Sequence, residues 1–272
     1  MNPFSTVELE NDPRGFATLW LDRPEKNNAF NALMIDELTR ALDQVQADTD
    51  LRFLLVRGRG RHFSAGADLT WMQACAQLDY QSNRDDAKRL GDLLYGLCHL
   101  AIPTLAVVQG SAFGGAVGLV SCCDLAIGSE DAVLSLSEVR IGLAPAVISP
   151  FVVQAIGERA ARRYALTAER FDGRRAVELG LFAHCYPCAE LEAALDQWIA
   201  RLQLNSPAAM RVTKDLLLKV GDGTPTPAVR SYCENAIAHI RVSPEGQEGL
   251  QAFLQKRPPR WQAAPSTKKD AH

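Results

Sequence analysis

The stretch from Ile102 to Cys123 constrains the fold more than any other part of the sequence. It contains no charged residue and is long enough to span a bilayer. Four glycines fall within nine of its residues, inside the segment QGSAFGGAVGL (109–119). Because Pro103 and these glycines disfavour one uniform helix, a membrane span is not expected. We predict a buried strand, a turn and a helix instead.

The composition favours a globular protein. The chain has 272 residues, of which 47% are apolar, and a formal net charge of −3. These values suit one domain with a sizeable core. Basic and acidic residues are interspersed, which leaves no basic stripe for nucleic acid phosphates, so we expect no nucleic acid partner. The polar N-terminus lacks the pattern of a secretory signal, and we expect a cytoplasmic protein with reduced cysteines.

Short strands alternate with helical patterns in the first part of the chain. VELE (7–10) and FATLWLD (16–22) are typical of strands, and Asn31 is a good N-cap for a helix that follows it. RFLLVRG (52–58) and PTLAVVQG (103–110) are short apolar runs that predict buried strands. A glycine-containing turn and a helical pattern follow each of them, so the sequence predicts two successive β-turn-α units and an α/β fold.

Helix-forming sequence dominates from Glu158 onward. Ser206 and Ser243 each precede a proline, which is the opening typical of a capped helix. A helical C-terminal third of this kind could cover the core or reach another subunit. The helical patterns cover residues 158–171, 173–182, 188–204, 206–220 and 243–262.

Two glycine turns are candidates for binding an oxygen anion. SAGAD (64–68) and the pair Gly114 and Gly115 both follow a predicted strand, and their small side chains leave backbone N–H groups exposed at a helix start. Two such turns on neighbouring strands could direct two donors at one carbonyl oxygen, although a tight connection is the favoured interpretation of a turn taken alone. Neither turn has a dinucleotide-binding or P-loop pattern, so nucleotide phosphates are not the expected ligand. The G-x-S-x-G pattern of an α/β-hydrolase is also absent.

Two other features remain open at this level. Cys185 and Cys188 have the C-x-x-C spacing of thiol redox sites, but a chance pair is favoured because no thioredoxin-like order of elements surrounds them. No second cluster supplies further ligands, so we predict no metal site. Glu138 lies between apolar neighbours, which disfavours its charged form and makes it a candidate acid/base; the alternative is a solvated surface residue.

From about Val7 to Trp261, the sequence resembles the enoyl-CoA hydratase/isomerase (crotonase) superfamily. The resemblance implies a ββα spiral in residues 1–200 that binds acyl-CoA, and a helical oligomerisation region in residues 201–272. It also implies a trimer or a dimer of trimers, and no cofactor other than the coenzyme A of the substrate. The motifs that carry it are LDRPEKNNAFN, GRHFSAGADL, the run from PTLAVVQG to RIGLAP, and FLQKRPPRW.

The same resemblance implies roles for individual residues. The N–H groups of Ala67 and Gly115 would hold the thioester oxygen, and Glu138 would be the acid/base. Lys26 and Lys256 match basic positions near the phosphates of coenzyme A. The positions expected to bind substrate are Lys26, Ala65, Gly66, Asp68, Leu69, Gly114, Gly118, Val147, Ile148, Phe151 and Lys256.

One departure from the family pattern bears on the reaction. Hydratases of this family commonly have two glutamates, and Gly118 stands at the first position, which leaves Glu138 alone. Either Glu138 positions the water by itself, or the reaction needs a single acid/base, as a double-bond isomerisation does. An acyl-CoA-binding protein without activity is a third possibility.

The sequences of two segments indicate a narrower class of substrates. FSAGADLTWM and the segment that begins EVRIGLAPAVISP are similar to bacterial methylglutaconyl-CoA hydratases and to hydratases of isohexenylglutaconyl-CoA. The resemblance implies hydration of a branched glutaconyl-CoA in leucine or acyclic isoprenoid catabolism, with Val147, Ile148 and Phe151 shaping the acyl pocket. The second carboxylate of such a substrate needs a partner, for which Arg140 and the arginines of GERAARRYALTAER are candidates.

Overall fold

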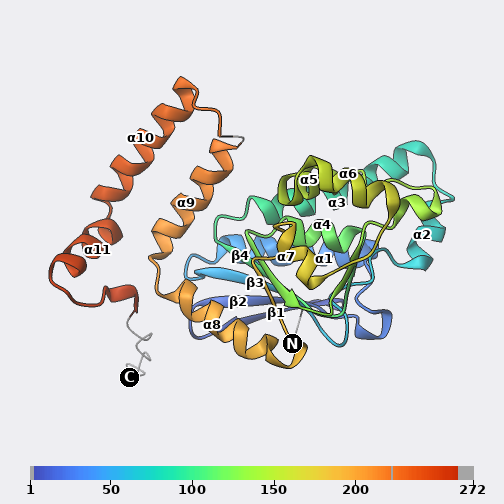
Figure 1. Ribbon diagram of the computed structural model, residues 1–272, viewed down its shortest axis with the longest axis horizontal. Coiled ribbons are helices and arrows are strands. Elements are labelled where there is room, and N and C mark those ends of the chain that lie inside the picture. Colours follow the sequence, from blue (N-terminus) through green and yellow to red (C-terminus); the bar gives the residue numbers. More distant parts are fainter. Residues whose placement is uncertain (1–2, 222, 263–272) are drawn as a thin grey trace.

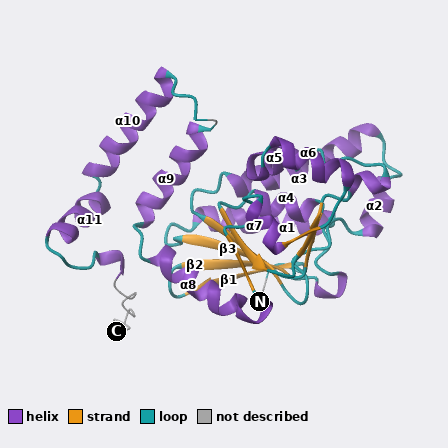
Figure 2. Cartoon of the chain, viewed as in Figure 1, coloured by secondary structure: helices purple, strands orange, loops and turns teal. Residues whose placement is uncertain are grey.

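The computed structural model describes residues 3–221 and 223–262, and a six-stranded sheet lies at its centre (Figures 1 and 2). The strand order is β1-β2-β3-β4-β6-β9, in which β1 is antiparallel to β2 and the other neighbours are parallel. A smaller sheet has the order β5-β7-β8. The strands are β1 Val7–Asp12, β2 Phe16–Leu21, β3 Phe53–Gly58, β4 Thr104–Val108, β5 Ser111–Phe113, β6 Leu125–Ser129, β7 Val133–Ser135, β8 Phe171–Asp172 and β9 His184–Tyr186.

Helices cover both faces of the large sheet. Successive side chains of a strand point to opposite faces, so each strand packs against both helical layers. In β3, Leu54 and Val56 belong to the main core, which includes residues of α1, α3 and α4, whereas Phe53 and Leu55 belong to a second cluster with α8. Figure 1 shows these two layers on either side of the strands. The helices of the body are α1 Ala32–Ala47, α2 Leu69–Cys75, α3 Tyr80–Cys98, α4 Gly115–Ser121, α5 Ser149–Ile156, α6 Glu158–Thr167, α7 Gly173–Glu178 and α8 Leu191–Gln203.

Three helices, α9 (Pro207–Val220), α10 (Pro227–Val242) and α11 (Pro244–Leu254), form an arm beside the body (Figure 1). Lys214 is the buried residue of α9, and its ammonium lies 2.8 Å from Asp124 Oδ2 and 3.1 Å from the Ile102 carbonyl oxygen. Asp124 Oδ2 also accepts hydrogen bonds from the N–H and hydroxyl of Thr104. An ion pair between this buried lysine and the partly exposed Asp124 therefore ties the arm to the turn between α4 and β6. Short 3-10 helices are η1 Pro24–Lys26, η2 Glu138–Ile141, η3 Cys188–Glu190 and η4 Arg260–Gln262.

Local signals in the sequence agree with this structure at several helix starts. The Asn31 side chain accepts a hydrogen bond from Met34 N–H, and Ser206 and Ser243 cap α9 and α11 in the same way. The charge-free stretch forms β4, β5 and α4. No helix among the described residues is long and apolar enough to cross a membrane.

Other expectations differ from the structure. The helix expected over 158–171 ends at Thr167, because Ala168 takes a left-handed backbone conformation with φ of 51° and β8 follows. Helix α10 was not expected. The predicted domain boundary at residue 200 falls inside α8, and the division into two parts stays a prediction.

Candidate functional site

The first glycine turn connects β3 to α2 and presents the Ala67 N–H group. Gly66 has a φ of 90°, and a β-carbon there would lie 2.7 Å from the Phe113 carbonyl oxygen, so glycine is required. Phe30 N–H donates to the Gly66 carbonyl at 2.7 Å, and Asp68 N–H donates to the Phe30 carbonyl at 2.8 Å. Successive N–H groups of an extended segment point to opposite sides. The Ala67 N–H therefore points away from Phe30, and no acceptor for it lies within the described part of the chain.

The second turn presents the Gly115 N–H group at the start of α4. Gly114 has a φ of 52°, and its N–H donates to the Ser135 carbonyl at 2.9 Å. The first N–H group of a helix has no partner within the helix, and Gly115 finds none elsewhere in residues 3–221 and 223–262. The Phe30 ring lies 3.5 Å from the position of a Gly115 β-carbon. Phe30 thus contacts both turns, a role that the sequence did not reveal.

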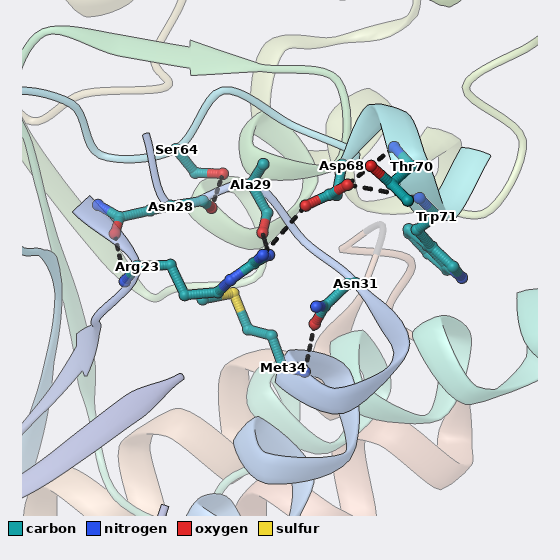
Figure 3. A network of polar contacts seen from close by, with 9 residues as sticks. All are labelled: Arg23, Asn28, Ala29, Asn31, Met34, Ser64, Asp68, Thr70 and Trp71. Carbon is teal, nitrogen blue, oxygen red and sulfur yellow. Dashed lines mark hydrogen bonds and ion pairs between the residues drawn. The ribbon is translucent and has the colours of Figure 1, made fainter. Parts of the chain in front are cut away.

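Arg23 and Asp68 fix the first turn from the side (Figure 3). The Arg23 guanidinium donates to the Ala29 carbonyl at 2.7 Å and to Asp68 Oδ2 at 3.1 Å, and both side chains of this ion pair are largely buried. Asp68 Oδ1 accepts from Thr70 N–H at 2.9 Å and so caps α2. Burial would raise the pKa of Asp68, but the bonds from Thr70, Arg23 and the Trp71 N–H hold this pKa below its usual value. The Asp68 carboxylate thus holds the turn, and its contact with substrate stays a prediction.

Asn28 connects the segment before α1 to the end of β3. The residue is fully buried and has a φ of 55°, a left-handed conformation that asparagine tolerates. Its Nδ2 lies 2.8–3.1 Å from the carbonyl oxygens of Arg59, His62 and Phe63, and the Ser64 hydroxyl donates to its carbonyl. The paired asparagines of NNAF were the available signal for this role.

Glu138 begins η2 and lies beside the second turn. Its Oε1 is 2.8 Å from the position that a β-carbon on Gly114 would take, so the missing side chain at Gly114 makes room for the carboxylate. Its Oε2 is buried and has no hydrogen-bond partner among the described residues. Burial raises the pKa of Glu138. A carboxylate with a free oxygen and a raised pKa is suited to take up and release a proton.

Ile148 occupies the space next to Gly118, one turn along α4. A β-carbon on Gly118 would lie 2.2 Å from Ile148 Cγ2 and 2.7 Å from Ile148 Cβ. The Ile148 side chain is only 2% exposed and cannot swing into solvent. A side chain larger than that of glycine does not fit at position 118 in this arrangement. A second carboxylate is therefore sterically excluded there. The wall of the site formed by Gly118 and Ile148 is apolar.

The comparisons with known proteins agree with this geometry. The family model described as enoyl-CoA hydratase/isomerase matches residues 11–264. The chain belongs to this family. It is 35% identical over 253 residues to a putative enoyl-CoA hydratase of Thermus thermophilus, covering 90% of this chain and 96% of that protein.

Solved structures confirm the fold. An enoyl-CoA hydratase from Shewanella pealeana has a TM-score of 0.90 and 44% identity, covering 95% of this chain and 97% of that one. Pseudomonas aeruginosa AtuE has a TM-score of 0.91 and 36% identity, covering 95% and 100%. The predicted crotonase-type α/β fold is confirmed. Family membership supports an enzyme with acyl-CoA hydratase chemistry in general, and an acyl-CoA thioester fits as its substrate.

Of the other residues expected to bind coenzyme A, some lie near the first glycine turn and one lies far from it. Ala65 N–H donates to the Asn27 carbonyl at 2.8 Å, next to Lys26 at the end of η1. Leu69 is 76% exposed at the start of α2 and is open to a ligand. Lys256 follows α11, which lies at the opposite end of the molecule from α2 in Figure 1. A single chain therefore does not bring Lys256 to the turn, and its role stays a prediction.

Three of the arginines considered for a second substrate carboxylate have other partners. Arg140 donates to the Ala168 carbonyl at 2.9 Å. Arg162 pairs with Glu158 on α6, and Arg163 pairs with Glu169. The structure thus leaves the partner of a distal carboxylate unassigned.

The cysteine pair shows no feature of a redox site. Cys185 and Cys188 are free thiols, and burial raises the pKa of Cys185, which disfavours the reactive thiolate. Among the described residues, no group of three histidine, cysteine or acidic side chains could hold a metal ion.

Proposed function

We propose that the protein is a hydratase that adds water reversibly across the α,β double bond of an enoyl-CoA, with branched glutaconyl-CoA thioesters as the substrate class. The observation that carries the proposal is the Glu138 carboxylate, whose free oxygen lies beside the turn that presents the Gly115 N–H. The substrates we have in mind are 3-methylglutaconyl-CoA and isohexenylglutaconyl-CoA, in leucine or acyclic isoprenoid catabolism.

The thioester oxygen is the group that the two turns would hold. Ala67 N–H and Gly115 N–H are both without acceptors in the described structure and can donate to it. Negative charge builds on this oxygen when water adds to C3 and the thioester becomes an enolate. Loss of one such donor typically costs about 2.7–4 kcal/mol of transition-state stabilisation.

Glu138 would carry out both proton transfers of the addition. In its ionised form the carboxylate accepts a proton from water while the water oxygen bonds to C3. The same carboxyl group then returns that proton to C2 of the enolate, so that H and OH are added and Glu138 is regenerated. Because Ile148 excludes a side chain at Gly118, this account uses one carboxylate. The glutaconyl class is supported by the similarity of the two sequence segments described above.

A double-bond isomerase is the second candidate, and the exclusion of a second carboxylate favours it specifically. One carboxylate suffices to move a proton from C4 to C2: it takes the proton from C4, which gives a dienolate whose oxygen the same two N–H groups would hold, and returns it to C2. The two reactions differ in the fate of solvent oxygen. In water enriched in heavy oxygen, a hydratase places the label in the product and an isomerase does not.

The test uses the purified protein with crotonyl-CoA, 3-methylglutaconyl-CoA and isohexenylglutaconyl-CoA. We expect labelled hydroxyacyl-CoA, and we expect Glu138→Gln to reduce kcat/KM by about 10²-fold or more. Glu158→Gln, on the exposed face of α6, is the matched control. Full activity of Glu138→Gln would refute the assigned base, and binding of thioesters without turnover would favour a non-catalytic binding protein.

We further propose a cytoplasmic protein that assembles as a trimer or a dimer of trimers. The family resemblance supports both. The mass of the assembly in solution, measured by light scattering, tests the second.

A further inference from the structure

A glycine in the middle of α3 lacks an explanation in the packing of the chain. Glycine is a poor helix former, and α3 contains it at Gly91 and Gly96. Neither residue has a positive φ. A β-carbon on Gly91 would meet only Val147 Cγ1 within 4 Å, at 3.6 Å, which is an ordinary contact. Neither the backbone nor the neighbours therefore require glycine at position 91.

The space beside Gly91 lies next to the candidate site. Val147 precedes Ile148, whose side chain contacts Gly118. Gly118 and Gly115 are three residues apart on α4 and so share one face of that helix. Neighbouring residues thus lead from the Gly115 donor through Gly118, Ile148 and Val147 to Gly91.

The surroundings of this space are apolar. Leu94 is buried, and Leu90 and Val147 are partly buried against the main core. Lys88 lies one turn before Gly91 and pairs with Asp92, and Arg89 pairs with Asp86, so both of these cations already have an acidic partner. Apolar neighbours of this kind favour a hydrocarbon group.

We propose that Gly91 and Val147 form a specificity subsite for a hydrocarbon branch on C3 of the substrate. The inference rests on the proposed function and makes it more specific. A branched glutaconyl thioester carries one more substituent on C3 than a linear enoyl thioester. The side chain missing at Gly91 leaves room for that substituent beyond Ile148.

The test compares Gly91→Ala with Gly96→Ala, a matched change in the same helix where a β-carbon would meet nothing within 4 Å. Both variants replace glycine by a better helix former, so both should fold and unfold at a higher temperature than the natural chain. The readout is the ratio of kcat/KM for 3-methylglutaconyl-CoA to kcat/KM for crotonyl-CoA. One methyl group in an apolar pocket changes such a ratio by about 10–200-fold, and we expect Gly91→Ala to lower it by about tenfold or more. Gly96→Ala should keep the ratio of the natural chain.

Two results would overturn the subsite. One is an unchanged ratio in Gly91→Ala, and the other is an equal fall in Gly96→Ala. Failure of the proposed function is separate, because it shows as absence of turnover with every thioester in the natural chain. In that case calorimetric binding of the same two thioesters replaces kcat/KM, and the ratio of their dissociation constants tests the subsite in the same variants.

Discussion

The contact between Gly118 and Ile148 predicts that substitutions at these two positions are strongly coupled. Gly118→Ala places a β-carbon 2.2 Å from Ile148 Cγ2, which is far inside van der Waals contact. Overpacking of this kind typically costs about 1–3 kcal/mol of unfolding free energy. Ile148→Ala removes most of a side chain that is 2% exposed, and a change of this type costs about 2–5 kcal/mol.

The double variant should cost less than the two changes added together. Ile148→Ala removes Cγ2, the atom that the new methyl group would meet first, and the methyl group in turn fills part of the vacated space. The relief is incomplete because Ile148 Cβ, at 2.7 Å from the new atom, remains. We expect a coupling free energy of about 0.5–3 kcal/mol in favour of the double variant, the range found for residues in direct contact.

Urea unfolding of the four proteins, followed by far-ultraviolet circular dichroism at one protein concentration, measures this coupling. Fixed concentration matters if the chain assembles, since assembly contributes to apparent stability. Additivity within about 0.5 kcal/mol would refute the steric argument. The same argument predicts that Gly118→Glu alone cannot supply a second working carboxylate.

Two further predictions concern buried charges. Burial raises the pKa of Glu138, so its contribution to stability is present below the unfolded pKa, near the ordinary 4.5, and is lost as pH rises through the folded pKa. Glu138→Gln should therefore melt at a higher temperature than the natural chain at neutral pH, with no gain below the ordinary value; a gain that persists in acid would contradict this. Lys214→Met removes the buried ammonium that pairs with the partly exposed Asp124 carboxylate and donates to the Ile102 carbonyl, and it should cost about 1–3 kcal/mol in urea unfolding; the absence of a measurable cost would mean that the pair does not hold the arm.

Sequence reasoning succeeded where the signal is local. Asn31 and Ser206 each mark the start of a helix. Their side chains accept a hydrogen bond from the N–H group of the residue three positions later. The two glycine turns were also visible, because small residues after an apolar run mark a strand-to-helix turn. Helix α10 was overlooked although Thr226 and Pro227 form a similar opening.

Contacts between distant segments were out of reach. Gly118 was recognised as a departure from the family pattern, but only the structure shows Ile148 filling its space. Arg23 lies 45 residues before Asp68, and no local pattern reveals that the two side chains are partners. Such pairs depend on how the sheet brings loops together, and periodicity or capping patterns carry no information about that.

Local opening of the segment from residue 23 to 31 would disrupt the site. It contributes no proposed reacting group, yet Arg23, Asn28 and Phe30 hold the first turn, and the Phe30 ring lies against the second. If this segment detached while the sheet stayed folded, Ala67 and Gly115 would lose their common support. Activity would then be lost at a lower free energy than global unfolding, and amide hydrogen exchange near Ala67 would follow the opening of this segment, not that of the central strands.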